Sequence, residues 1–262
     1  MRAIVFLICT IVFAWASFCA PIRSVVGGRQ SFMIEVSEQG YSAADYVQDG
    51  LVAMWDGIEN ADWGVHDAEA TSWKDLIGTR DAVLAGNYSW LDNCIHRASD
   101  SSTSIVLPDI AIVHGFYIEY CCALLNAGGG NYRDIALTTS KRLELVQNSN
   151  GSTSLYFRNS NGGYVSRAYR LYIATSTLPR TFGFGFTDAG VVYALNGNGP
   201  YWDSTVNTIL DNTFYGSQDI VIGKYRSLYE DAYYYSIRVY DRPLSVEEIA
   251  HNYEIDRLRF GL

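Results

Sequence analysis

Between Gly50 and Tyr240 the chain repeats one pattern, in which short runs of alternating apolar and polar residues are separated by turn-forming residues. Neighbouring side chains of a strand point to opposite faces, so this alternation suits sheets with one buried face. Turn signals roughly every 8–12 residues are typical of β-sandwiches and barrels, whereas parallel sheets need longer helical segments between their strands. The pattern therefore predicts an all-β fold of antiparallel sheets.

The expected strands can be assigned by residue range. They cover residues 50–55, 82–85, 104–107, 116–125, 143–147, 154–158, 164–174, 180–187, 191–195, 219–223 and 232–240. Asn150-Gly151 lies between two of them and is the strongest hairpin signal, because both residue types tolerate the positive φ of a type I′ turn.

One short helix is expected at the C-terminal end, over residues 246–257. Ser245 and Glu248 have the spacing of a capping box, and Gly261 is a suitable stop. Its expected apolar stripe contains Leu244, Ile249, Tyr253 and Leu258.

Composition limits the class of protein further. Hydrophobic residues make up 48% and charged residues 18% of the chain, which excludes a disordered protein. The 20 Tyr, 11 Phe and 6 Trp favour pleated, half-buried surfaces. A net charge of −9 excludes nucleic acid as the partner, because such binding needs Lys and Arg to neutralise phosphates.

Residues 1–20 differ from the rest of the chain. Arg2 is followed by uncharged residues 3–20, which end in small residues and are typical of a secretory signal peptide. The alternative is an uncleaved anchor, since a stretch of this length just spans a bilayer. Both place the rest of the chain in a secreted or cell-surface location, with membrane contact only through residues 1–20 if they are retained. We expect residues 21–45 to be a lead-in linker and residues 46–262 to form one domain.

Three of the five cysteines, Cys94, Cys121 and Cys122, follow that segment. An odd number is unusual for an oxidising compartment. Adjacent strand residues point to opposite faces, so at most one of Cys121 and Cys122 can meet Cys94. One disulfide with a free thiol and three buried thiols both remain open.

Several short segments resemble a known family. They are GLVAMWDG (50–57), WKDLIG (73–78), VVYALNG (191–197) and RVYDRPLS (238–245). They resemble the laminin-G-like, concanavalin A-like jelly-roll domains of secreted bacterial proteins, over residues 46–260. The resemblance implies a two-sheet antiparallel jelly-roll sandwich with Trp55 and Trp73 in its core. This fold carries lectins, hydrolases and adhesive modules alike, so the function depends on the site.

An enzyme is not expected. Glycoside hydrolases on this fold carry a Glu-x-Asp-x-x-Glu strand, whereas the Glu-x-Asp here, Glu254-Ile255-Asp256, lacks the second Glu. It also lies in the expected helix, where Glu254 and Asp256 diverge by about 200°. No Gly-x-Ser-x-Gly esterase motif occurs.

A calcium ion is the one cofactor that the resemblance suggests, because many relatives bind calcium through loop carboxylates and carbonyls. The candidate metal ligands are Asp56, Asn60 and Asp62, which follow the first expected strand. Turn formation explains Asp and Asn in a loop equally well.

Aromatic residues in loops are the candidate ligand contacts. Sugars stack their C–H faces on Trp and Tyr and need polar groups nearby. Tyr201, Trp202 and Asp203 follow Gly and Pro in an expected loop over residues 197–203, and Trp63 with His66 form a second candidate rim. Packing over the edge of the sandwich is the alternative role for Tyr201 and Trp202.

These observations predict a non-catalytic recognition module that binds a glycan. The alternative is a structural or adhesive surface protein whose partner is another protein. A glycoside hydrolase of the same fold is the third, minor possibility.

Overall fold

The computed structural model describes residues 40–100, 102–126, 132–138, 143–148, 153–158, 164–169, 178–187, 190–203, 216–225, 228–229 and 231–262, and two short strands before them. The chain divides into two units, Met1–Gly40 and Tyr41–Leu262. In the first unit, β1 (Arg23–Val26) and β2 (Arg29–Phe32) pair antiparallel. The expected signal or anchor segment, residues 1–20, lies outside the described residues. No helix in the described part of the chain is long and apolar enough to cross a membrane.

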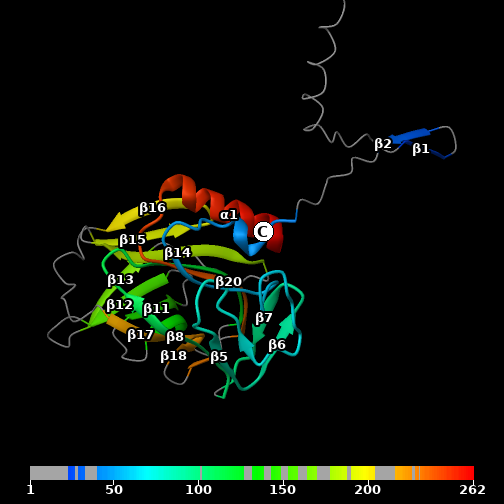
Figure 1. The fold of residues 1–262 in the computed structure, drawn as a ribbon. Coiled ribbons are helices and arrows are strands. Elements are labelled where there is room, and N and C mark those ends of the chain that lie inside the picture. The colour runs from blue at the N-terminus through cyan, green and yellow to red at the C-terminus, as the bar shows by residue number, and fades with distance from the viewer. Residues whose placement is uncertain are drawn as a thin grey trace, which may run out of the picture. The chain divides into compact units, whose positions relative to one another are not determined.

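The second unit contains two antiparallel sheets, which confirms the predicted all-β sandwich (Figure 1). Sheet I has the order β13-β12-β11-β10-β17-β8-β5-β4. Its strands are β4 (Ser72–Trp73), β5 (Ala82–Ala85), β8 (Ser104–Ile112), β10 (Tyr132–Thr138), β11 (Leu143–Asn148), β12 (Thr153–Arg158), β13 (Tyr164–Tyr169) and β17 (Gly216–Ile222).

Sheet II has the order β16-β15-β14-β9-β20-β7-β6, and β3 also pairs with β20. Its strands are β3 (Leu51–Asp56), β6 (Tyr88–Leu91), β7 (Cys94–Arg97), β9 (Tyr117–Asn126), β14 (Arg180–Thr187), β15 (Gly190–Leu195), β16 (Asn198–Asp203) and β20 (Asp231–Tyr240). A small hairpin of β18 (Lys224–Tyr225) and β19 (Leu228–Tyr229) belongs to neither sheet. The chain passes repeatedly from one sheet to the other, so β9 pairs with β20 and β8 with β17 across long stretches of sequence.

The predicted strands are all present in the described chain. β5 and β14 begin and end at the predicted residues, and β11 pairs with β12 as the hairpin that Asn150-Gly151 predicts, although the turn itself lies outside the described residues. Five strands of the two sheets, β4, β6, β7, β10 and β16, lie outside the expected ranges, and the first three of them are short.

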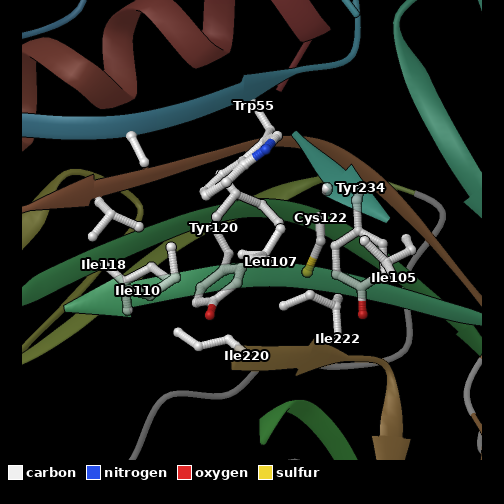
Figure 2. Close-up of a cluster of buried hydrophobic side chains, with 14 of the residues drawn as sticks. Trp55, Ile105, Leu107, Ile110, Ile118, Tyr120, Cys122, Ile220, Ile222 and Tyr234 are labelled. Carbon is white, nitrogen blue, oxygen red and sulfur yellow. The ribbon is translucent and has the colours of Figure 1, made fainter. Parts of the chain in front are cut away.

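The main core lies between the two sheets. It is built from alternate residues of β8 and β17 on one side and of β9, β14 and β20 on the other. Figure 2 shows Ile105, Leu107 and Ile220 of sheet I facing Tyr120 and Tyr234 of sheet II. Trp55 and Trp73 are both fully buried, as the family resemblance implies.

Helix α1 (Val246–Phe260) begins at the predicted residue and continues past the predicted end at residue 257 to the predicted stop, Gly261. The Ser245 hydroxyl accepts from the Glu248 amide at 3.2 Å, and the Glu248 carboxylate accepts from the Ser245 amide at 2.8 Å. Gly261 ends the helix with a φ of 73°, a left-handed conformation that glycine adopts without strain.

The inner face of α1 differs from the expected apolar stripe. Tyr253 is only partly buried and Leu258 is 45% exposed, whereas two polar residues, Asn252 and Asp256, are fully buried. The prediction that Tyr253 and Leu258 belong to the buried stripe is therefore wrong, because the helix packs on sheet II through polar groups as well as apolar ones.

Replacing Ser245 by Ala is expected to lower the free energy of unfolding by about 1 kcal/mol, because the first turn of α1 loses its capping oxygen. Urea denaturation measures this as a lower midpoint at an unchanged slope. Ser245→Thr keeps the hydroxyl and serves as the control. An unchanged midpoint in Ser245→Ala would show that the cap contributes nothing to the folded state.

Candidate ligand-binding surface

The hairpin of β15 and β16 positions the first predicted aromatic pair. Asn196 and Gly197 form its two-residue turn with φ values of 48° and 74°, the geometry of a type I′ turn. Residues 198–203 then form the edge strand β16 rather than the expected loop, so the loop prediction for 197–203 is wrong. An edge strand tolerates Pro200, because one side of its backbone has no ladder to complete.

Tyr201 and Trp202 are 47% and 51% exposed, but they lie on opposite faces of β16. Tyr201 is opposite Tyr193, whose ring is 5.3 Å away, on the side of the inter-sheet core. Trp202 is opposite Val192, which belongs to the cluster beneath α1. The strand therefore does not bring the two rings together into one stacking surface, and the Asp203 side chain lies outside the described residues.

Trp63 lies at the tip of the loop between β3 and β4. The Val65 amide donates to the Asp62 carbonyl oxygen at 2.9 Å, and the Ala61 amide donates to the Val65 carbonyl oxygen at 3.2 Å. Gly64 has a φ of 68°, which suits the third position of a type II turn. We call residues 61–65 the Trp63 turn. This turn holds Trp63 at the surface, where the residue is 41% exposed.

His66 and Asn60 stabilise the rest of this loop. The His66 ring lies on the surface with Nδ1 3.1 Å from the Ile58 carbonyl oxygen, a distance at which Nδ1–H donates. The buried Asn60 side chain accepts from the Asp67 amide at 2.7 Å and donates to the Asp67 carbonyl oxygen at 2.8 Å. Trp63 and His66 thus belong to one hydrogen-bonded loop, and their contact with a ligand stays a prediction.

Glu59 connects the Trp63 turn to the body of the sandwich. Its carboxylate is buried and accepts from the Gly64 amide at 2.9 Å and from the Ala43 amide at 2.6 Å. Ala43 begins the 3₁₀ turn η1 (Ala43–Asp45). Arg259 of α1 lies 3.1 Å from the same carboxylate.

The three predicted metal ligands serve other contacts. The buried Asp56 accepts through Oδ1 from the Ile58 and Glu59 amides and from Arg259 at 2.9–3.0 Å. Burial raises the pKa of Asp56, and Arg259 partly offsets this. Asn60 bonds Asp67, and the exposed Asp62 accepts from the Trp63 amide at 2.8 Å. Among the described residues there is no group of three or more His, Cys, Asp or Glu arranged to hold a metal ion. Calcium binding stays a prediction from the resemblance.

A buried ionic network joins α1 to sheet II, and the sequence pattern does not predict it. Arg238 of β20 donates to Asp256 at 2.7 and 2.8 Å and to Glu119 of β9 at 3.2 Å. Asp256 also accepts from the hydroxyls of Tyr46 at 2.7 Å and Thr181 at 2.5 Å. We call Arg238, Glu119, Asp256 and these hydroxyl donors the Arg238 network. The available signal was Asn252 and Asp256, four residues apart on the inner side of the expected helix.

Electrostatics explain how this network tolerates burial. Removal from water alone lowers the pKa of Arg238, but the carboxylates of Asp256 and Glu119 outweigh that effect and raise it. Burial raises the pKa of Glu119, with Arg238 opposing the shift. Arg238 thus stays charged between two acidic partners. Its hydrogen bonds to Asp256 and Glu119 replace those that it would make to water.

Cys94, Cys121 and Cys122 are buried and form no disulfide, which settles the open alternatives in favour of three thiols. β20 lies between β7, which carries Cys94, and β9, which carries Cys121. Cys122 faces the inter-sheet core, whereas Cys94 and Cys121 pack on the outer side of sheet II. Burial raises the pKa of Cys94 to about 12, which keeps it a thiol at neutral pH.

No protein-family model and no curated protein sequence matches this chain. Solved structures with a similar fold include the receptor-binding domain of botulinum neurotoxin C/D mosaic serotype, with 14% identity and a TM-score of 0.60 over 79% of this chain and 52% of that chain. Trypanosoma rangeli sialidase has 14% identity and a TM-score of 0.59 over 79% of this chain and 33% of that chain. A further structure is that sialidase in complex with sialic acid, with a TM-score of 0.57.

This chain spans about a third of the length of the sialidase chains and about half of the toxin domain. At 14% identity the likeness concerns the backbone. The protein has a β-sandwich fold, and its likeness to these structures concerns the fold alone.

Proposed function

We propose that the protein is a non-catalytic glycan-recognition module of the laminin-G-like, concanavalin A-like type, secreted or displayed at the cell surface. The observation that carries the proposal is the exposed Trp63 indole on a turn already held by hydrogen bonds, next to His66. The solved structures of similar fold add support, since one is described as a receptor-binding domain and another as a complex with sialic acid.

Trp63 suits a sugar for two physical reasons. Its flat apolar face can stack on the C–H face of a pyranose ring, while nearby polar groups bond the hydroxyls. The exposed carboxylates of Asp62 and Asp67 provide hydrogen-bond acceptors in the same loop. A turn held before binding also loses little conformational entropy on binding, which favours affinity.

A glycan array tests the proposal. The full chain, labelled outside the sandwich, is applied to plant, animal and bacterial glycans, and binding to one structural class is the expected result. Recovery of the bound glycan unchanged after prolonged incubation would support the non-catalytic part, whereas shortened products would identify a hydrolase. Silence across the whole array would contradict glycan recognition.

Trp63→Ala is expected to weaken binding to the best array glycan by about 1–3 kcal/mol, roughly 5- to 150-fold, the loss associated with an aromatic anchor. Isothermal titration calorimetry gives the affinity. Trp202→Ala is the matched comparison, because it removes a second exposed indole, 51% exposed against 41% for Trp63, from a different element. If Trp202→Ala abolishes binding and Trp63→Ala does not, the contact surface lies along β16 instead.

Adhesion to a protein partner is the second candidate function, and β16 favours it. The strand ends sheet II and carries two half-exposed aromatic residues, Tyr201 and Trp202. Exposed edge strands pair with extended segments of other proteins, and aromatic side chains are enriched at such interfaces. A silent array, together with a cross-link from position 202 to a single purified surface protein, would favour this function.

A further inference from the structure

We infer that Glu59 is the positioning residue of the Trp63 turn, and that Arg259 in the last turn of α1 holds Glu59 in that position. The importance of the turn for ligand binding rests on the function proposed above. The positioning itself is a property of the fold and can be tested without any ligand.

The first step concerns the two oxygens of the Glu59 carboxylate. Oε2 accepts from the Gly64 amide at 2.9 Å, next to Trp63 at the tip of the turn. Oε1 accepts from the Ala43 amide at 2.6 Å and from Arg259 at 3.1 Å. The other hydrogen bonds of the Trp63 turn described above run within the loop. Glu59 therefore connects the tip of the turn to buried groups of the sandwich.

The second step is that both acceptor oxygens are needed. A glutamine side chain has almost the same shape as glutamate but offers only one acceptor oxygen, and its other terminal atom is an N–H donor. Glu59→Gln would place that donor against either the Gly64 or the Ala43 amide. A buried amide left without an acceptor is costly, so one of the two contacts must open. The more exposed partner, Gly64, is the one that can turn towards water.

The third step concerns Arg259. Its guanidinium is 2% exposed and contacts both Asp56 Oδ1, at 2.9 Å, and Glu59 Oε1 through the same nitrogen. The backbone amide of Glu59 also donates to Asp56 Oδ1 at 3.0 Å. Each of Asp56, Glu59 and Arg259 is therefore hydrogen-bonded to the other two. Both contacts are made by Nη2, and a lysine side chain is one atom shorter, so its ammonium does not reach the position that Nη2 occupies. The end of α1 thus influences the turn without being part of the exposed rim.

Amide hydrogen exchange measured by NMR on the full chain tests the inference. In Glu59→Gln we expect exchange at Gly64 to accelerate at least tenfold, while the amide of Ile237, in the centre of β20, keeps its rate. Arg259→Lys should accelerate amide exchange at Gly64 by a smaller factor than Glu59→Gln does. Arg257→Lys is the control, because Arg257 lies on the exposed side of the same helical turn and pairs with Glu254.

A second readout follows Trp63 directly. In protein labelled with 5-fluorotryptophan, the Trp63 fluorine resonance, assigned by its loss in Trp63→Phe, should narrow or shift in Glu59→Gln while the Trp55 resonance does not. A merely structural role for Glu59 would change Ile237 exchange and the Trp55 resonance as well.

The outcomes separate the two proposals. Unchanged Gly64 exchange in Glu59→Gln overturns the positioning role, whatever the array shows. Accelerated Gly64 exchange in Glu59→Gln but not in Arg259→Lys overturns the part assigned to Arg259. If Glu59→Gln does not fold, Arg259→Lys provides the test of the Glu59–Arg259 pair as a unit. Faster Gly64 exchange with unchanged Ile237 exchange supports the positioning by this pair, and unchanged Gly64 exchange overturns it. A silent array removes the proposed glycan function and leaves the exchange result standing.

Discussion

Asp256→Asn is expected to lower the free energy of unfolding by about 3–5 kcal/mol, the range found when one partner of a buried ion pair is removed. The Asp256 carboxylate accepts hydrogen bonds from both terminal nitrogens of Arg238 and from the hydroxyls of Tyr46 and Thr181. Asparagine keeps the volume but removes the charge, and it places an N–H donor among groups that are themselves donors. Arg238 is then left in the interior with Glu119 as its remaining ionic partner.

Urea denaturation at neutral pH measures this loss. Glu254→Gln, two residues earlier on α1, is the control, since Glu254 lies at the surface and its ion pair with Arg257 is screened by water. The control should unfold at the same urea concentration as the unaltered chain. A loss below about 1 kcal/mol in Asp256→Asn would contradict a dry, fully charged Arg238 network.

Trp73→Ala is expected to cost about 3–5 kcal/mol, because it removes a large aromatic side chain from a close-packed site. Trp73 is fully buried and meets the Trp90 ring edge-on, with the ring centroids 5.7 Å apart. Its indole N–H also donates to the Asp56 carbonyl oxygen at 2.8 Å, so the variant leaves that acceptor unpaired at the end of β3.

Thermal and urea denaturation should show a large loss of stability in Trp73→Ala and almost none in Trp63→Ala. Trp63 is the matched control, since it is the same residue type in the loop that leads into β4 but lies in solvent. Its removal should change stability by less than about 1 kcal/mol. Equal destabilisation by the two variants would make Trp63 a packing residue and remove the basis of the glycan proposal.

Local signals account for the parts of the fold that the sequence predicts. Helix α1 begins at Ser245–Glu248 because a cap is a short-range interaction within four residues, and the pairing of β11 with β12 follows from the local turn signal Asn150-Gly151. Trp55 and Trp73 were assignable to the core through the family resemblance, and both are buried. Trp63 is exposed, and its predicted place on a ligand-binding rim stays a prediction.

The remaining features depend on partners that are distant in sequence. The burial of Asp256 depends on Arg238 and Glu119, which lie on two other elements. Hydrophobic periodicity therefore places Leu244 and Ile249 correctly but wrongly adds Tyr253 and Leu258 to the inner face of α1. β16 contains Gly and Pro, which are typical of loops. A strand that contains Pro is compatible with a position at the edge of a sheet, and the sequence alone does not give that position. Glu59 carries no motif, and its role follows from amides at Ala43 and Gly64 that only the folded chain brings together.

The contacts of α1 with the start of the second unit also bear on the order of events during synthesis. Tyr46 reaches Asp256 across 210 residues, and Glu59 reaches Arg259 across 200. Contacts of such separation form late, because the entropy of closing a long loop must be overcome first. While the ribosome still holds the residues after Tyr240, Glu119 and Arg238 lack Asp256, and Asp56 lacks Arg259. The sandwich therefore completes its packing only after α1 emerges, and until then the nascent chain exposes the outer face of sheet II to chaperones and proteases.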